Sequence, residues 1–170
     1  PPPPPTPTYV PPTPEPTPVE PEPFEFPELE VSSFDDCGEI VAPTSPFAQL
    51  MFMSEADTNP TVICMGEAIG DGCAAAAARV TTAPDSDGSA YVVERNDGEC
   101  AIGFSEDGET ASLCSLTTIM AQYTGENRSF DEWSESFAAD PGGMMADLIE
   151  NSFELLSSPS APFDCEIYQL

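Results

Sequence analysis

Apolar and polar residues alternate with a period of two in several parts of the chain, and this pattern predicts β-strands. The clearest case is a pair of β-rich runs at residues 89–95 and 99–105, separated by Asn96-Asp97-Gly98. Asp-Gly between two such runs is a strong signal for a tight turn. We therefore predict a β-hairpin here, and a last strand over residues 163–170.

Helical spacing of apolar residues is clearest in the C-terminal half of the chain. Thr110 is the predicted cap of a first helix, and Gly125 is its predicted end. The buried face of this helix would consist of Leu113, Leu116, Met120 and Tyr123.

Ser129 and Glu132 have the spacing of a capping box, which predicts the start of a second helix. Residues 140–143 (Asp-Pro-Gly-Gly) should end it, and a third helix is predicted over residues 144–156. The apolar residues of these two helices are Phe130, Trp133 and Phe137, followed by Met145, Leu148, Ile149, Phe153 and Leu156.

Three earlier segments are assigned from composition. Residues 73–80 are rich in alanine, the best helix former, and Asp71 is a suitable cap, so we predict a helix there. Residues 46–53 form either a buried strand or, as we prefer, a short helix. Residues 61–65 are either a short strand or the start of a helix. Together the elements predict an α+β fold with a small antiparallel sheet and several helices.

Residues 1–27 contain 14 of the 21 prolines. Proline fixes φ and lacks an N–H donor, so this segment is predicted to be an extended polyproline II arm. We divide the chain into a proline-rich arm, residues 1–33, and a cystine-stabilised acidic domain, residues 34–170. Such an arm is either a semi-rigid spacer or a strap that docks onto a neighbouring molecule.

Apolar residues alternate with glutamate at the end of the arm, and the alternation changes phase at Pro27. This pattern predicts an extended strand with an edge or bulge at the proline. The strand would pair with the sheet of its own domain, which we prefer, or with the exposed edge of a neighbour. If the arm binds a partner, the apolar anchors are Tyr9, Phe24, Phe26, Leu29 and Val31.

The chain carries 31 acidic residues against three arginines and contains no lysine or histidine, so its formal net charge is −28. Such a surface repels phosphate backbones and anionic lipids, so we expect neither a nucleic-acid partner nor membrane attachment. A saline habitat or a cationic partner would screen the repulsion. No apolar run is long enough to span a bilayer, although an upstream leader or anchor stays open.

The number of cysteines is even, none lies in a CxxC pattern, and no histidine is present to complete a zinc finger. Disulfides are the simplest interpretation, and they imply an oxidising compartment: extracellular, cell-surface or periplasmic. We prefer a bond between Cys37 and Cys165, which would close the ends of the domain. The remaining four, Cys64, Cys73, Cys100 and Cys114, would pair among themselves.

The missing residue types argue against catalysis. Without histidine or lysine, the chain lacks Ser-His-Asp, Cys-His, Ser-Lys and Schiff-base systems, and it has no phosphate-binding loop. A pair of carboxylates, as in glycosidases, is the remaining scheme, with Asp140 and Asp147 near Trp133 as an unspecific example. We expect a protein that is not an enzyme and needs no cofactor.

Other motifs suggest modifications or a metal ion. Asn127 lies in the sequon Asn-Arg-Ser. Asp85, Asp87 and Glu94 partly match a calcium loop, but Ala83 stands where its first carboxylate is required. Threonines that neighbour prolines are candidate O-glycosylation sites, and they are Thr6, Thr8, Thr13 and Thr17.

These observations favour a structural or assembly subunit of an extracellular or cell-surface complex, such as a filament, sheath or envelope. It would dock to neighbouring subunits of the same assembly through its proline-rich arm. The alternative is a monomeric secreted or periplasmic module that binds a glycan or calcium and is carried on a passive spacer. A hydrolase that uses only carboxylates is the third possibility.

Overall fold

The computed structural model describes residues 26–42, 55–82, 86–106, 108–156 and 164–170. In chain order its elements are η1 (Val31–Ser33), β1 (Asp35–Ala42), η2 (Ala56–Thr58), α2 (Pro60–Gly70), β2 (Ala76–Thr82), β3 (Ser86–Glu94), β4 (Cys100–Ser105), β5 (Thr110–Ser115), α3 (Leu116–Thr124), α4 (Phe130–Ala139), α5 (Pro141–Leu156) and β6 (Cys165–Gln169). Residues 1–25 and 46–53 lie outside the described residues, so the predictions made for them stay predictions.

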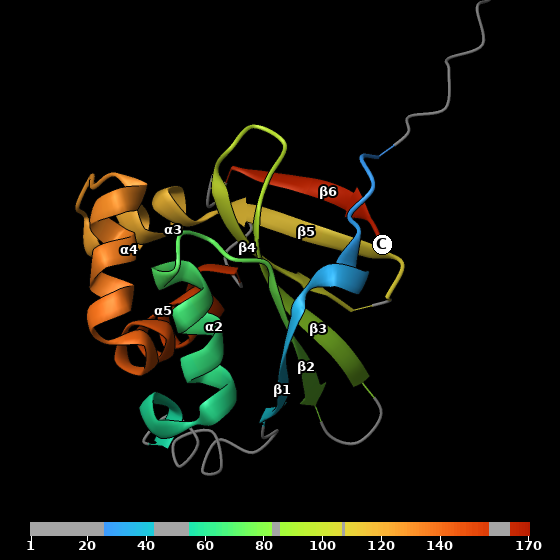
Figure 1. Ribbon diagram of the computed structural model, residues 1–170, viewed down its shortest axis with the longest axis horizontal. Coiled ribbons are helices and arrows are strands. Elements are labelled where there is room, and N and C mark those ends of the chain that lie inside the picture. The colour runs from blue at the N-terminus through green and yellow to red at the C-terminus, as the bar shows by residue number, and fades with distance from the viewer. Residues whose placement is uncertain (1–25, 43–54, 83–85, 107, 157–163) are drawn as a thin grey trace, which may run out of the picture.

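The six strands form one mixed sheet in the order β1-β2-β3-β4-β5-β6 (Figure 1). The predicted hairpin is confirmed as β3 and β4, and the predicted last strand as β6. The expectation of a purely antiparallel sheet is wrong, because β1 and β2 are parallel. Parallel neighbours need a crossover connection, and α2 lies in the segment that joins these two strands. The fold is α+β.

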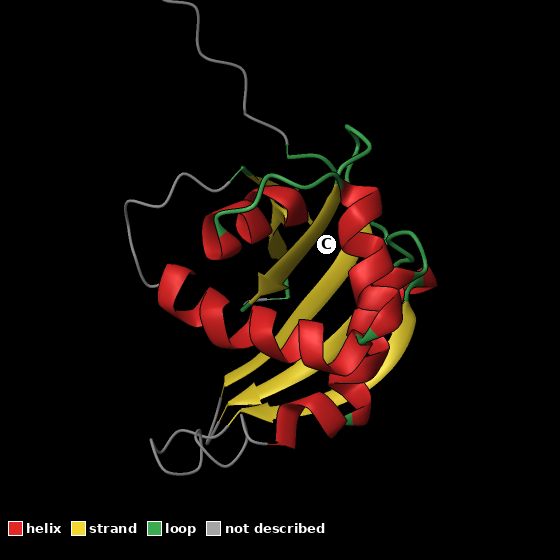
Figure 2. Cartoon of the chain, turned by 90° about the vertical axis from the view of Figure 1, so that its left-hand side faces the viewer, coloured by secondary structure: helices red, strands yellow, loops and turns green. Residues whose placement is uncertain are grey.

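The helices cover one face of the sheet (Figures 1 and 2). Between this helical layer and the sheet lies the main core, which includes Val62 and Ile69 of α2, Val92 of β3 and Phe137 of α4. Helices α2 and α5 approach closely, since a Cβ on Gly66 would lie 2.1 Å from the Pro141 carbonyl oxygen. Among the described residues, no helix is long and apolar enough to cross a membrane.

The alanine-rich segment forms strand β2, so the predicted helix over residues 73–80 is wrong. Ala76 and Ala78 are buried under the helices, whereas Ala77 packs on the opposite face of the sheet. This period of two shows that tertiary packing overrides the helix propensity of alanine. Asp71 follows the end of α2 and does not cap a helix start.

Residues 61–65 belong to helix α2, in agreement with the second of the two alternatives considered for them. The Asn59 side chain accepts hydrogen bonds from the N–H groups of Thr61 and Val62. Pro60 occupies the first helical position, where its missing N–H costs nothing. The helix start is therefore encoded locally.

The helix predicted from Thr110 is wrong in its first half. Thr110–Ser115 is strand β5, which pairs with β4 and β6, and helix α3 begins only at Leu116. Ser115 caps α3, and Gly125 ends it with a φ of 74°, as predicted. Leu113 was assigned to the buried face of the predicted helix, but it belongs to strand β5. The same apolar pattern therefore fits a strand followed by a helix.

The capping box of Ser129 and Glu132 is confirmed at the start of α4. Helix α5 begins at Pro141 instead of residue 144, because Asp140 caps it by accepting a hydrogen bond from Gly143 N–H at 3.0 Å. Met145 and Leu148 are buried as predicted. The side chains of Phe153 and Leu156 lie outside the described residues.

All six cysteines form disulfides, which are Cys37–Cys64, Cys73–Cys100 and Cys114–Cys165. The preferred pair Cys37–Cys165 is wrong, since β1 and β6 are the two outer strands of the sheet. Five strand spacings separate them, roughly 24 Å, which no disulfide spans. The three bonds join β1 to α2, the segment after α2 to β4, and β5 to β6. They indicate an oxidising location, extracellular or periplasmic.

Candidate interaction surface

Residues 29–34 lie against the sheet face that the helices leave uncovered. Leu29, Val31 and Phe34 pack there on a second apolar cluster, and the Phe34 and Tyr91 rings meet edge to face with centroids 6.1 Å apart. The buried members of this cluster are Tyr91, Val93, Ala101, Ala111, Leu113 and Tyr168. The end of the proposed arm therefore completes the fold of its own domain.

This segment also pairs with the outer edge of β6, as preferred for the alternating strip. Leu29 N–H donates to the Gln169 carbonyl at 2.7 Å, and Gln169 N–H donates to the Pro27 carbonyl at 2.9 Å. The pairing is a parallel bridge between Glu28 and Gln169. In this register the donor facing the Ile167 carbonyl would belong to Pro27, which has no N–H. Pro27 therefore stops the ladder at this point.

Beside this edge lies a line of exposed apolar side chains, which we call the apolar row: Phe26, Phe104 and Ile167. They are 38%, 37% and 47% exposed. Phe104 of β4 pairs with Ser112 of β5, and Ser112 pairs with Ile167 of β6. The side chains of these three paired residues therefore point to the same face of the sheet. Phe104 and Ile167 are thus two strands, or about 10 Å, apart.

The apolar row lies on the face of the sheet that carries the helices, because Ile102, two residues before Phe104, packs into the main core. The Phe104 ring lies over Gly88 of β3, where a Cβ would be 2.3 Å from the ring. Phe26 lies two residues before Glu28, whose bridge to Gln169 brings this segment to the edge of β6. The helices leave this end of the sheet open to solvent, as the exposure of the row shows.

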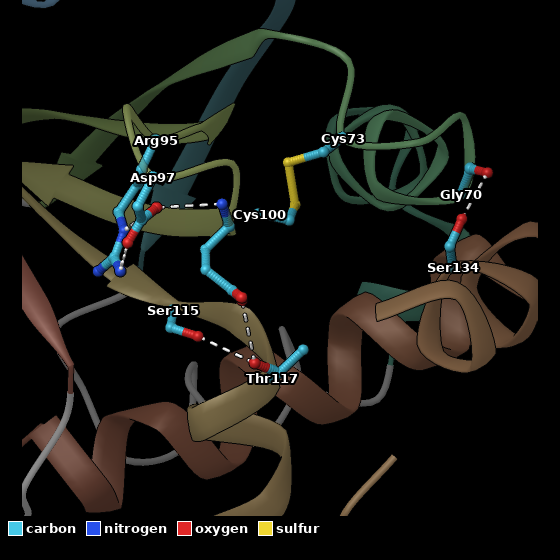
Figure 3. Close-up of a disulfide and its surroundings, with 9 residues drawn as sticks. Gly70, Cys73, Arg95, Asp97, Cys100, Ser115, Thr117 and Ser134 are labelled. Carbon is cyan, nitrogen blue, oxygen red and sulfur yellow. Dashed lines mark hydrogen bonds and ion pairs between the residues drawn. A yellow bond between two sulfur atoms is a disulfide. The ribbon is translucent and has the colours of Figure 1, made fainter. Parts of the chain in front are cut away.

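Asp164 and Glu166 are exposed at the start of β6, and Arg95, the cation bound to Asp164, is already engaged. The Arg95 guanidinium is buried and forms ion pairs with Asp97 and Asp164 (the Asp97 pair is visible in Figure 3). Hydrogen bonding to Asp97 raises the pKa of Arg95, against the opposing effect of burial. The same bond, with the N–H of Glu99, lowers the pKa of Asp97. Arg95 is therefore a structural cation and is not available to a ligand.

Glu166 and Tyr168 occupy the opposite face of β6 from Ile167. The Tyr168 hydroxyl donates to Glu166 Oε2 at 2.8 Å, and the ring is buried. Burial, followed by this hydrogen bond, raises the pKa of Tyr168. The exposed Glu166 is thereby held at the edge of the sheet, one residue from the apolar row.

The carboxylates considered for catalysis line a shallow hollow of about 280 Å³. Its lining consists of Asp57, Asp140, Gly143, Met144, Ala146, Asp147 and Glu150. Asp140 is engaged as the cap of α5. Trp133 is only 2% exposed and does not line the hollow. Among the described residues, the hollow thus brings four carboxylates together beside Met144 and Ala146.

The residues of the suggested calcium loop are not brought together. Asp87 and Glu94 lie near opposite ends of β3, seven residues and roughly 23 Å apart along the strand, and Asp85 lies outside the described residues. Within the described part of the chain, no cluster of histidine, cysteine or acidic side chains is arranged to hold a metal ion.

Asn127 of the sequon is exposed in the loop between α3 and α4. This loop borders a second open hollow of about 640 Å³, which is lined by Thr117, Thr118, Ala121, Gln122, Asn127, Arg128 and Ser129. Arg128 stacks on the Trp133 ring with 4.2 Å between the guanidinium carbon and the ring centroid. Because Trp133 is buried beneath Arg128, it offers no exposed ring on which a sugar would stack.

Sequence reasoning named Phe26 but missed Phe104, Ile167 and Glu166. The signal for Ile167 is in the sequence, since Ile167 and Tyr168 are adjacent in a strand and must point to opposite faces. Only the structure shows that one of these faces is open at this end of the sheet.

No protein-family model matches the chain. No curated protein and no solved structure is found to be similar to it.

Proposed function

We propose that this protein is a non-enzymatic structural subunit of an extracellular or cell-surface assembly. Its proline-rich arm, residues 1–33, would connect it to neighbouring subunits, and the cystine-linked domain would be the rigid body. The proposal includes Tyr9, Phe24 and Phe26 as apolar anchors of the arm. Docking of a polyproline II segment is favoured because it loses little conformational entropy on binding.

The observation that carries the proposal is the attachment of the arm to the body. Leu29 is hydrogen-bonded to Gln169, and Leu29, Val31 and Phe34 are packed on the sheet. Shortly afterwards Cys37 is bonded covalently to α2 through Cys64. A pulling force on the arm would therefore be carried by its pairing with β6 and by the Cys37–Cys64 disulfide, and it would not simply detach a loose terminus.

The test compares two N-terminal truncations, of which only the first leaves the described fold intact. Deleting residues 1–25 leaves the segment that packs on the second apolar cluster intact, whereas deleting residues 1–34 removes it. We expect the full chain to sediment as part of a larger assembly in extracts of its source. The first truncation should give a folded monomer with an unchanged melting temperature, and the second should be destabilised. Assembly that persists without residues 1–25 would refute the proposal.

A further inference from the structure

The loop between α3 and α4 presents an asparagine to solvent within an acceptor sequence for oligosaccharide transfer. Asn127 is followed two positions later by Ser129, and the residue between them is not proline. Asn127 is exposed, and it lies in a part of the loop that is neither helix nor strand. The structure therefore places the sequon where a bulky group on the side-chain amide would point into solvent.

The two residues that follow Asn127 are held by bonds to α4. Ser129 N–H donates to Glu132 Oε2 at 2.8 Å. The Arg128 guanidinium donates to the Glu132 carbonyl at 2.9 Å and to Ser136 Oγ at 3.0 Å. None of these bonds uses the side-chain amide of Asn127, so a sugar attached to its Nδ2 would leave them intact.

Space for a sugar lies directly beside this amide. Asn127 borders the open hollow of about 640 Å³, whose other wall is the outer face of α3. The α3 residues of this wall are short or carry a hydroxyl or amide group, and they are Thr117, Thr118, Ala121 and Gln122. Hydroxyl and amide groups are hydrogen-bond partners for sugar hydroxyls. The surroundings of Asn127 thus suit a sugar both in size and in polarity.

The site lies on the opposite side of the sheet from the segment that carries the arm. Helices α3 and α4 belong to the layer that covers one face of the sheet (Figure 1). Leu29, Val31 and Phe34 pack on the other face. A sugar chain at Asn127 would therefore not cover the attachment of the arm. The three disulfides indicate an oxidising location, and sequons in the surface loops of secreted proteins are the ones that receive sugars.

We propose that Asn127 carries an N-linked oligosaccharide. The donor is an oligosaccharide linked through phosphate to a lipid. Asn127 Nδ2 forms a bond to C1 of the first sugar and loses one proton, while the bond from C1 to the phosphate oxygen breaks and the lipid phosphate leaves with the electron pair. The Ser129 hydroxyl is bonded to Glu132 in the folded protein, so the transfer acts on the chain before the first turn of α4 closes. This modification does not depend on the arm.

The test is peptide-resolved mass spectrometry of the full chain secreted by its source cells, with variants secreted by the same cells. We expect the peptide that contains Asn127 to carry the mass of a sugar chain, with fragment ions that place it on this residue. Asn127→Gln should lose the whole of this mass. Ser129→Ala should lose it as well, although it leaves Asn127 in place, because the hydroxyl two positions later is part of the acceptor sequence.

Two matched controls should keep the sugar. Ser129→Thr retains a hydroxyl at the position that the transfer requires. Asn96→Gln removes another exposed asparagine, which has Gly98 two positions later and is therefore no acceptor. Loss of the sugar from Asn96→Gln would contradict the assignment to Asn127.

Two further results would overturn the proposal. One is an unmodified Asn127 in the secreted protein, and the other is a sugar mass on the same peptide that persists in Asn127→Gln or Ser129→Ala. Deletion of residues 1–25 should leave the sugar at Asn127 in place, while it removes any sugar on the threonines of the arm. Failure of arm-mediated assembly and failure of the modification are therefore distinguishable.

Discussion

The guanidinium of Arg95 donates to both the backbone carbonyl and the carboxylate of Asp164, each at 2.9 Å. Arg95 follows β3 directly, and Asp164 directly precedes β6. A single buried side chain thus joins the β3–β4 turn to the entry of the edge strand. Next to it, the Cys114–Cys165 disulfide joins β6 to β5. The edge strand is held at its first residues by an ion pair and a covalent bond.

Replacing Arg95 by methionine should destabilise the fold by about 2 kcal/mol, because the substitution removes several hydrogen bonds of a buried charged group. Urea denaturation would measure the loss. Arg79→Met is the control, since Arg79 is exposed on β2 and its replacement should change stability by less than about 0.5 kcal/mol. Equal effects of the two substitutions would contradict the structural role given to Arg95.

Asp97 should make the free energy of unfolding depend on pH in the acidic range. Its pKa in the folded protein lies below the ordinary value of 3.8 because of Arg95, so Asp97 binds its proton less readily in the folded state. Its contribution is present above pH 3.8 and is lost as the pH falls through the folded pKa. The difference in unfolding free energy between the unchanged protein and Asp97→Asn should follow this course. In an Arg95→Met background the pH dependence of that difference should become smaller, leaving the part that comes from the hydrogen bond with the N–H of Glu99.

Salt should stabilise the protein. Repulsion among the acids that produce the net charge of −28 opposes the compact state, and added ions shorten its range to about 10 Å at 0.1 M. The midpoint of urea denaturation is expected to rise with sodium chloride and then level off. An equal concentration of sucrose, which carries no charge, controls for effects unrelated to screening. A midpoint that stays constant in salt would show that the charges are too dispersed to matter.

Ser129→Ala should cost about 1 kcal/mol, because it removes the cap of α4. In the capping box, the Ser129 hydroxyl accepts from Glu132 N–H, and Glu132 Oε2 accepts from Ser129 N–H at 2.8 Å. Ser129→Thr keeps both the cap and the sequon of Asn127, so it is the matched control. Thermal denaturation of the three proteins would compare them, and an unchanged midpoint for the alanine variant would contradict the prediction.

The contribution of each disulfide to the free energy of unfolding should increase with the length of the loop that it closes. Cys37–Cys64 and Cys73–Cys100 both span 27 residues, and Cys114–Cys165 spans 51. Loop-closure entropy gives about 3.5 kcal/mol for either short loop and about 4 kcal/mol for the long one. Paired alanine substitutions, unfolded in guanidinium, would measure each loss. If the Cys114/Cys165 pair proves the least costly, the ion pair of Arg95 already supplies most of the restraint on β6.

The elements that could be predicted from sequence are those whose signals are local. The Asp97-Gly98 turn, the Ser129 capping box and the helix end at Gly125 depend on hydrogen bonds and dihedral angles within a few residues, and all three are confirmed. The failures are non-local. Alanines at residues 74–78 favour a helix in isolation, but in the fold β2 lies between two strands and beneath a helix.

The candidate surface was less predictable for the same reason. Pairing of Cys37 with Cys64 depends on the crossover that places α2 beside β1, and this contact joins residues 27 positions apart in the sequence. Likewise, the exposure of Ile167 depends on where the helical layer stops. Phe26 was identifiable because the alternation around Pro27 is visible in the chain itself.

The bridge between Glu28 and Gln169 has a further consequence for engineering. It places the first described segment beside the last strand, so the two ends of the described fold lie close together. Because this pairing is parallel, a permutant that joined Leu170 to Phe26 would need a linker long enough to cross back along the edge, and opening the exposed loop at Glu126 should leave the described strand pairings and all three disulfides in place. The order in which the elements are synthesised is therefore separable from the architecture that they form.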